Sequence, residues 1–358
     1  KKLLLVNIED AIENFISSGC TDYDMARVCY MMLGDELVCI NPSTTSEWMR
    51  FDKKQHTWKV TPNGNYFRIY LSEYVYDVFE KQRKKLVDQY SAFTTLATSM
   101  TNSNHEECLK SIQEKMKIME TVKKQVKTEA YKSKIIKEAS HCFVFFKESI
   151  DGITNFENEL NMKPQLVGFK NGVFDLEVGQ FRDGIPDDMV SMSTGMMYRE
   201  YKKTDDIYIK CVNVLNTILS DKDVREYILS YIASCYYGYR EDETFTIWTG
   251  TGANGKTILQ NMIEKAFGDY YKPLSAKSLT SSRVEAGKPD PELFGLKGAR
   301  VAFFSEPDDT KTDAINSGYI KQLTGGESIS TRTLHKSNIT FKPNAALFLA
   351  CNDIPRMT

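Results

Sequence analysis

The chain has 358 residues, of which 41% are hydrophobic and 26% are charged. This balance is typical of a folded globular protein and excludes wholesale disorder. The net charge of -2 excludes a uniformly basic nucleic-acid coat, although such a sum leaves room for a local basic track.

Other bulk features exclude further classes of protein. The eight cysteines form no CxxC pair and no histidine cluster accompanies them, so neither a disulfide framework nor a zinc site is predicted. Free thiols of this kind favour an intracellular, non-secreted protein. No membrane partner is expected, because no apolar run reaches the ~20 residues of a membrane span. The chain begins with Lys1 rather than Met and stops at Thr358, so we expect a piece of a longer polypeptide.

Residues 1–150 are expected to be mostly helical, with a small β-hairpin at about 37–70. The hairpin alternates aromatic and polar residues around turn formers, and carries Trp48, Phe51 and Trp58. These rings fit a base-stacking surface or, as is commoner on half-buried strands, the apolar side of a small sheet. Residues 71–150 are lysine-rich with a helical period, and their interspersed glutamates favour solvated helix faces over a phosphate-binding track.

The second half of the chain changes character twice. Residues 151–204 form a separate turn-rich region, in which Asn171-Gly172 between apolar runs predicts a tight turn. Residues 205–237 return to a helical period. After Gly238 the order is strand, loop, helix and further strands, which is the α/β layout of a nucleotide-binding domain.

Residues 250–257 have the pattern GxxxxGK[ST], between a predicted strand at 245–248 and a predicted helix whose Ile258 and Leu259 face inward. Such a loop turns backbone N–H groups and a helix N-terminus toward phosphate oxygens. The lysine compensates β/γ-phosphate charge, and the threonine hydroxyl ligates Mg²⁺. We therefore predict an ATP and Mg²⁺ site rather than a chance glycine-rich turn. Its loop comprises Gly250, Thr251, Gly252, Ala253, Asn254, Gly255, Lys256 and Thr257.

Two later strands also end in polar residues. The apolar run 301–304 leads into Ser305-Glu306, where a carboxylate would hold Mg²⁺ and polarise an attacking water, unless the segment is only an acidic loop. Ser305 stands where many NTPases have a second acid. Another apolar run ends at Asn352, whose amide would orient the γ-phosphate or the lytic water, although a lone Asn there is often a turn former. The catalytic candidates are Lys256, Glu306 and Asn352, and the metal-ligand candidates are Thr257 and Glu306.

Residues 329–341 are predicted to form a β-hairpin with a basic tip. Lys321, Arg332, Lys336 and Lys342 would supply several phosphate contacts. Taken alone, an ordinary surface hairpin is the favoured interpretation.

Taken in order, these motifs resemble the superfamily 3 helicases. Specifically, they resemble the poxvirus-type primase-helicases of large DNA viruses and the related phage and plasmid primases. The resemblance rests on the GxxxxGKT loop, the acidic strand 301–306, KQLTGGESISTRTL at 321–334 and Asn352. The stretch 169–195 looks like the domain that precedes the helicase core, so the resemblance covers about 165–358.

The resemblance implies an AAA+-like P-loop ATPase domain over 205–358, with collar helices at its start and its C-terminal part missing. Residues 151–204 would be the pre-helicase domain. The family implies a homo-oligomeric ring, usually a hexamer, that hydrolyses ATP and moves along single-stranded or forked DNA with other viral replication proteins. Its site would be that of viral genome replication in the host cell, with the cytoplasm favoured over the nucleus. An arginine finger is expected beyond Thr358, and any primase domain before Lys1.

On the same resemblance, the residues expected on the DNA-contacting hairpin are Lys321, Arg332, His335 and Lys336. Three functions then compete: a DNA helicase or translocase, a nucleotide-gated oligomeric scaffold or loader at the replication fork, and a nucleotide or metabolite kinase. The kinase is disfavoured because it leaves the basic hairpin unexplained. Turnover stimulated by single-stranded DNA separates the helicase from the scaffold.

Overall fold

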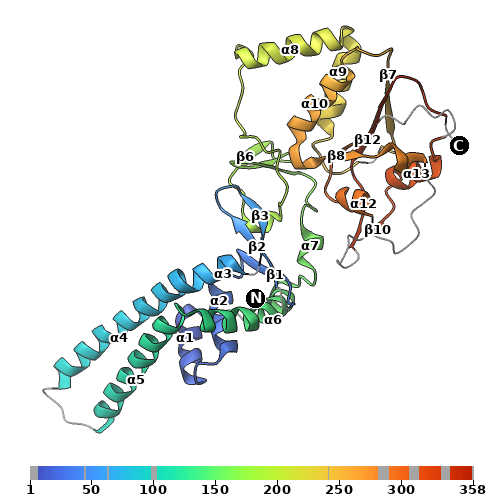
Figure 1. Ribbon diagram of the computed structural model, residues 1–358. Coiled ribbons are helices and arrows are strands. Elements are labelled where there is room, and N and C mark those ends of the chain that lie inside the picture. Colours follow the sequence, from blue (N-terminus) through green and yellow to red (C-terminus); the bar gives the residue numbers. More distant parts are fainter. Residues whose placement is uncertain are drawn as a thin grey trace. The chain divides into compact units, whose positions relative to one another are not determined.

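The computed structural model describes residues 7–43, 46–62, 64–97, 103–240, 242–280, 290–305, 314–331 and 339–356. The chain divides into two compact units (Figure 1). Unit 1 comprises Lys1–Phe51 and Lys59–Phe156, and unit 2 comprises Asp52–Trp58 and Glu157–Thr358. None of the helices in the described ranges combines the length and apolarity that crossing a membrane requires.

Unit 1 consists mainly of helices, in agreement with the prediction of a helical N-terminal region. Its helices are α1 (Ile8–Ser17), α2 (Asp22–Leu33), α3 (Asn65–Tyr70), the π-helix η1 (Leu71–Val75), α4 (Tyr76–Ala97), α5 (Ser103–Gln125) and α6 (Glu129–Asp151). Side-chain oxygens of Asn7 and Thr21 accept hydrogen bonds from first-turn N–H groups, which explains where α1 and α2 begin. Helices α4 and α5 lie side by side (Figure 1).

The predicted hairpin is a three-stranded sheet, but it is shorter than expected. Its strands are β1 (Leu37–Asn41), β2 (Glu47–Asp52) and β3 (Thr57–Pro62), in the order β1-β2-β3. The sheet ends at Pro62, and residues 65–70, which were expected to belong to it, form helix α3. Gly64, with φ of 61°, takes the left-handed turn that begins this helix, a conformation that glycine adopts without strain.

The aromatic residues of this sheet are core side chains. Trp48 is fully buried against Phe67 and Phe143, and Phe51 and Trp58 are 5% and 2% exposed. The interpretation of these rings as a base-stacking surface is therefore wrong, because a stacked base needs an accessible ring face.

The lysine-rich helices of unit 1 carry ion pairs. Arg83 Nη2 lies 3.0 Å from Glu80 Oε1, and Lys123 Nζ lies 3.0 Å from Glu120 Oε2 and also pairs with Glu80. The hydrogen bonds from Arg83 and then Lys123 hold the pKa of Glu80 at about 2, well below its ordinary value. Part of the lysine pattern is therefore explained by glutamates on neighbouring turns and helices.

Unit 2 begins with a small antiparallel sheet of β4 (Leu166–Phe169), β5 (Gly172–Asp175) and β6 (Gln180–Arg182), after the short helix α7 (Phe156–Glu159). A tight turn is present as predicted, but it lies one position earlier than Asn171-Gly172: Phe169 pairs with Gly172, so Lys170 and Asn171 form the turn and Gly172 begins β5. The Arg182 guanidinium makes two hydrogen bonds of 2.7 and 2.8 Å to the buried carboxylate of Asp188, at the end of the 3-10 helix η2 (Pro186–Asp188).

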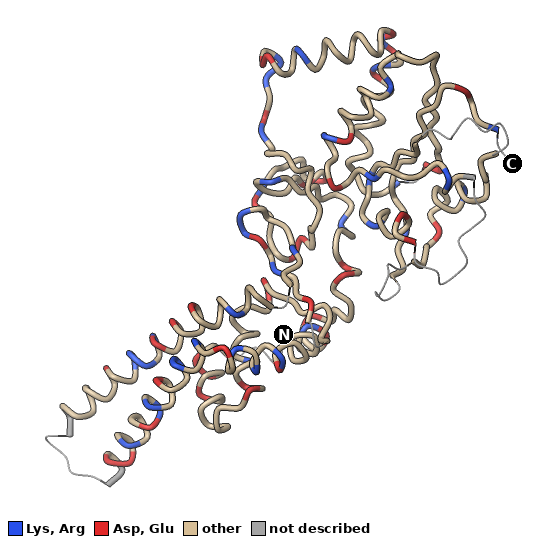
Figure 2. The backbone as a smooth tube through the Cα atoms, viewed as in Figure 1, with Lys and Arg blue, Asp and Glu red and all other residues tan. Residues whose placement is uncertain are grey.

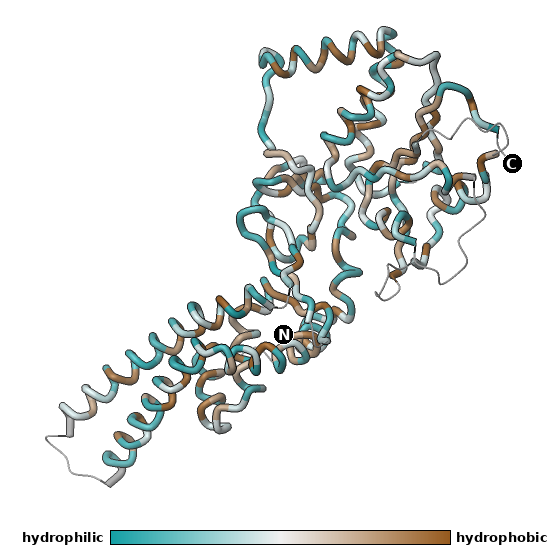
Figure 3. Tube along the Cα trace, in the orientation of Figure 1, coloured by the Kyte–Doolittle hydropathy of each residue, from teal (hydrophilic) through white to brown (hydrophobic). Residues whose placement is uncertain are grey.

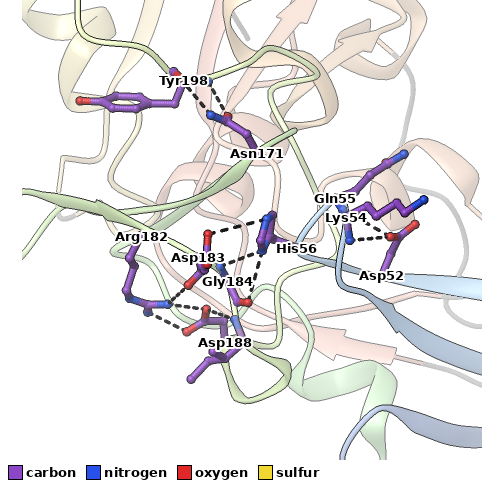
Figure 4. Close-up of polar contacts among 11 residues, drawn as sticks. Asp52, Lys54, Gln55, His56, Asn171, Arg182, Asp183, Gly184, Asp188 and Tyr198 are labelled. Atoms are coloured by element: carbon purple, nitrogen blue, oxygen red, sulfur yellow. Dashed lines mark hydrogen bonds and ion pairs between the residues drawn. The ribbon is translucent and has the colours of Figure 1, made fainter.

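Residues 52–58, which run from the last residue of β2 to the second residue of β3, pack within unit 2 (Figure 4). The Trp58 indole N–H donates to Pro186 O at 2.9 Å, and the Trp58 backbone N–H donates to Val190 O at 2.8 Å. The Gly184 N–H donates to His56 Nδ1 at 3.2 Å. The connection is therefore anchored at three points on the segment that follows β6.

The rest of unit 2 is built around a parallel sheet with the strand order β7-β12-β9-β8. Its strands are β7 (Phe245–Thr249), β8 (Tyr271–Leu274), β9 (Val301–Phe304) and β12 (Ala346–Cys351). The central strands β9 and β12 are apolar (Figure 3). They are also almost wholly buried, as expected when both faces of a parallel sheet are covered. The α/β layout predicted after Gly238 is thus confirmed.

Helices and a hairpin complete unit 2. They are α8 (Asp206–Ile218), α9 (Lys222–Ser234), α10 (Lys256–Phe267), η3 (Gly268–Tyr270), α11 (Ala276–Thr280), α12 (Pro291–Gly295), α13 (Ser317–Thr324), β10 (Ile329–Thr331) and β11 (Ile339–Phe341). Leu259, Ile263 and Phe267 of α10 share a core with Phe303 and Phe348, whose rings stack at 4.6 Å on neighbouring strands. This packing fixes α10, and hence its first turn, against the sheet.

Candidate functional site

Three strand ends meet at the carboxyl edge of the parallel sheet. Strands β7 and β9 both pair with β12 in parallel, so the residues that follow these three strands lie at one edge. They are the loop that starts at Gly250, Ser305 and Asn352. Ligands of open α/β sheets bind outside this edge, so it is the first place to look for chemistry.

The loop at 250–255 is tightly curled between β7 and α10. Gly252, Ala253 and Gly255 have φ angles of 67°, 49° and 85°, all in the left-handed region, and Gly252 N–H donates to Gly250 O at 2.8 Å. The left-handed conformation of Ala253 is strained, and such strain tends to be retained at functional sites. Helix α10 begins at Lys256 without a side-chain cap, so its first N–H groups are free for an anion.

The ammonium of Lys256 joins the loop to the end of β12. Its Nζ donates to Gly250 O at 2.8 Å, to Asn254 Oδ1 at 3.2 Å and to Asn352 Oδ1 at 3.2 Å. Two of the three residues predicted to be catalytic, Lys256 and Asn352, are therefore in direct contact although 96 positions separate them.

Gly250 and Asn254 pack closely inside this loop. A Cβ built on Gly250 would lie 1.8 Å from Asn254 Nδ2 and 3.4 Å from Lys256 Nζ. The absence of a side chain at 250 thus lets the Asn254 amide fold back over the loop and reach the ammonium. Asn254, which occupies a variable position of the GxxxxGK[ST] motif, is therefore a hydrogen-bond partner of Lys256.

The loop borders a cleft of about 460 Å³. Its walls include Thr257 and Gln260 on α10, Ser305 after β9 and Asn352 after β12. The Thr257 side chain is exposed, and its hydroxyl makes no hydrogen bond within the described part of the chain, so it is free to ligate a cation. Gln260 was not predicted, although it lies four residues after Lys256 and hence on the same helix face.

One predicted orientation in α10 is wrong. Ile258 was expected to face inward with Leu259, yet it is 54% exposed and lines the cleft, whereas Leu259 is buried. Ser305 has a structural contact, because its hydroxyl accepts a hydrogen bond from Ala276 N–H at 3.0 Å. This contact joins the end of β9 to the segment after β8.

The other predicted residues belong to the acidic strand end and to the region of the basic hairpin. Glu306, Arg332, His335 and Lys336 lie outside the described residues. The predicted hairpin is present, since β10 and β11 pair antiparallel with Ile329 opposite Phe341. Lys321 was expected on that hairpin, but it lies in helix α13, which ends before Gly325.

Comparison with known proteins places the chain in a family. Residues 41–224, just over half of the chain, match the family described as "D5 N terminal like". The chain belongs to this family. Residues 248–358 match a second family, DUF5906, whose function is unknown.

Curated relatives of this D5 N terminal like chain come from large DNA viruses. "Putative helicase L207/L206" of Acanthamoeba polyphaga mimivirus is 34% identical over 308 residues, which are 86% of this chain and 30% of the relative. "Putative helicase 121R" of Invertebrate iridescent virus 3 is 34% identical over 60% of this chain and 22% of the relative. "Putative primase C962R" of African swine fever virus is 23% identical over 92% of this chain and 34% of the relative. The resemblance to viral primase-helicases is thereby confirmed.

The chain spans only about a fifth to a third of the length of these relatives. Among solved structures, one titled "The apo structure of NrS-1 C terminal region (305-718)" is 15% identical over 40% of this chain and 34% of that one, with a TM-score of 0.33.

Proposed function

We propose that this chain is the ATP-hydrolysing part of a DNA helicase or translocase that acts in viral DNA replication. The observation that carries the proposal is the Lys256 ammonium, held between the curled 250–255 loop and Asn352 above a cleft at the carboxyl edge of a parallel sheet. A cation, a free helix N-terminus and a strained glycine-rich loop together suit a polyphosphate. We infer that the domain is an AAA+-like P-loop ATPase.

Each residue of the site has a definable role in this proposal. The loop and the first turn of α10 bind the phosphates, and Lys256 compensates the charge of the β- and γ-phosphates. Asn352 orients the terminal phosphate or the water that attacks it, and Glu306 accepts the proton of that water. Thr257 and Glu306 are the proposed ligands of Mg²⁺, which when bound would neutralise phosphate charge.

Coupling to DNA is assigned to the β10–β11 hairpin. Arg332, His335 and Lys336 lie in the sequence between its two strands, where basic groups suit contacts with the phosphates of a single strand. Lys321, on α13, is retained as a DNA contact outside the hairpin. We further propose that the protein assembles into a homo-oligomeric ring that binds one DNA strand. The ring would act with other replication proteins at the intracellular site of viral genome replication.

The decisive experiment measures ATP hydrolysis by the full-length protein with and without single-stranded DNA. We expect Lys256→Ala to abolish hydrolysis and Lys336→Ala to reduce the DNA stimulation while nucleotide binding is kept. Lys84→Ala, an exposed lysine of unit 1, is the matched control. Equal stimulation of the parent and Lys336→Ala would refute the role of the hairpin. Turnover that ignores DNA, together with nucleotide-dependent assembly, would instead favour the scaffold or loader.

A further inference from the structure

The segment that joins the small β4–β6 sheet to helix α8 lies open to solvent. Residues 195–204 belong to no helix or strand, and all of them are exposed except Tyr198, which is half-buried. The exposed side chains include Met197 and Tyr201, which are 62% and 63% exposed. These exposed apolar side chains make the segment a candidate for a binding surface, which its charges and aromatic contacts test further.

The surface is locally basic although the chain as a whole is not. Lys170, Arg199, Lys202, Lys203 and Lys210 are exposed on it, and none of them pairs with an acid within the described residues. Lys170 belongs to this surface because its backbone N–H donates to Met196 O at 2.9 Å. The acidic residues of the same stretch are Glu200, Asp205 and Asp206. Basic positions recur along this connection in Figure 2, and they favour a polyanionic partner.

The segment is held in place from the small sheet (Figure 4). Asn171 accepts a hydrogen bond from Tyr198 N–H at 2.7 Å and donates one to Tyr198 O at 3.0 Å. The Tyr198 ring stacks on Phe181 with centroids 4.4 Å apart. Because the backbone is already held at Tyr198, a ligand that binds to residues 199–204 would lose little free energy in ordering the segment.

An aromatic platform follows directly after this anchor. Tyr201 stacks on Tyr208 of α8 at 5.2 Å, with an angle of 15° between the rings. Tyr208 covers one face of Tyr201, and the high exposure of Tyr201 leaves the other face to solvent. A supported ring with one open face, flanked by lysines, has the composition of a site at which nucleic-acid bases stack and phosphates are neutralised.

We propose that residues 196–210, together with Lys170, form a binding surface for single-stranded nucleic acid. Tyr201 stacks on a base, and Lys202 and Lys203 contact the adjacent phosphates. The surface is separate from the β10–β11 hairpin and needs no bound nucleotide. It would hold a strand at the junction between the small sheet and the α/β core, whether or not the ATPase is active.

The test measures the affinity of the full-length protein for fluorescein-labelled oligo(dT) by anisotropy, without nucleotide, over a range of salt concentrations. The double variant Lys202→Glu/Lys203→Glu is compared with Lys84→Glu/Lys110→Glu, which makes the same charge change on exposed lysines of α4 and α5. We expect the first pair to weaken binding by about tenfold or more and to lower the salt slope by about 1.4, since each lost phosphate contact contributes about 0.7. The control pair should leave both nearly unchanged.

Tyr201→Ala and Tyr201→Phe test stacking separately from charge. We expect Tyr201→Ala to weaken DNA binding by about 5- to 100-fold. Tyr201→Phe should bind DNA almost as tightly as the parent protein, because phenylalanine keeps the ring. Since no nucleotide is present, the result stands even if the proposed ATPase activity is absent.

Two outcomes would overturn the proposal. Equal weakening by the two lysine pairs would mean that only net charge matters. Normal DNA binding by the Lys202→Glu/Lys203→Glu variant, with a loss of self-association in light scattering, would identify the surface as a contact between copies of the chain.

Discussion

Replacing Gly250 with alanine tests whether the loop acts as a unit with Asn254. The φ of Gly250 is outside the left-handed region, so an alanine fits the backbone there. Its Cβ, however, would fall 1.8 Å from Asn254 Nδ2. The Asn254 amide must therefore move, and its contact with the Lys256 ammonium is lost. Gly250→Ala and Asn254→Ala should thus remove the same interaction by different routes.

The size of the effect follows from that interaction. The Lys256 Nζ to Asn254 Oδ1 distance is 3.2 Å, and the pair is exposed. A hydrogen bond to a charged group contributes about 1.5–3 kcal/mol, and solvent exposure reduces this to about 1 kcal/mol. We expect about fivefold weaker nucleotide binding in each variant, because the ammonium is less well held for the phosphates. The double variant should be no weaker than either single variant.

The assay is a titration of each variant with a fluorescent ATP analogue, with thermal unfolding without nucleotide to check the fold. Gly295→Ala is the matched control, since its added Cβ would meet only Lys272 Cδ at 3.9 Å. If the double variant instead loses the product of the two single effects, Gly250 and Asn254 act independently and the reasoning is refuted. If either single variant bound the nucleotide more tightly than the parent, the predicted direction of the effect would be wrong.

Three further predictions concern stability. Trp48→Ala should lower the unfolding free energy of unit 1 by about 3–5 kcal/mol in a denaturant titration, because the indole is fully buried. Asp188→Asn should cost about 1–3 kcal/mol by the same measurement, because it leaves a half-exposed arginine without its bidentate partner. Glu80→Gln should lower the melting temperature above about pH 5. The hydrogen bonds from Arg83 and then Lys123 lower the folded-state pKa of Glu80 to about 2, so its stabilising contribution is lost as the pH falls toward that value. The difference from the parent should therefore shrink in acid, and a constant difference would contradict this account.

The parts of the site that follow from backbone geometry could be predicted from the sequence. A glycine-rich loop between a strand and a helix fixes where Lys256 begins α10, and parallel strands bring their carboxyl ends to one edge. The place of Asn352 next to the sheet edge follows in the same way. The contact of Asn254 with Gly250 does not, because it depends on a side-chain rotamer that no pattern encodes.

The errors have equally specific causes. Residues 65–70 contain aromatic and β-branched side chains, so propensity favours a strand, but packing on α6 stabilises a helix. Ile258 is apolar and on a helix, yet apolar periodicity cannot reveal that one helix face borders a cleft. Lys321 belongs to the same sequence motif as the hairpin, but Gly325 ends α13 between them.

The placement of residues 52–58 has a practical consequence for anyone who dissects this protein into fragments. A single cut after Phe156 would leave this heptapeptide on the N-terminal piece, whereas its hydrogen-bond acceptors Pro186 and Val190 stay on the other. Pro186 O and Val190 O of the C-terminal piece would then lose the hydrogen bonds that Trp58 donates to them. An expression boundary placed after Phe156 therefore separates residues 52–58 from the part of unit 2 that they pack against, and a fragment of unit 2 needs them included.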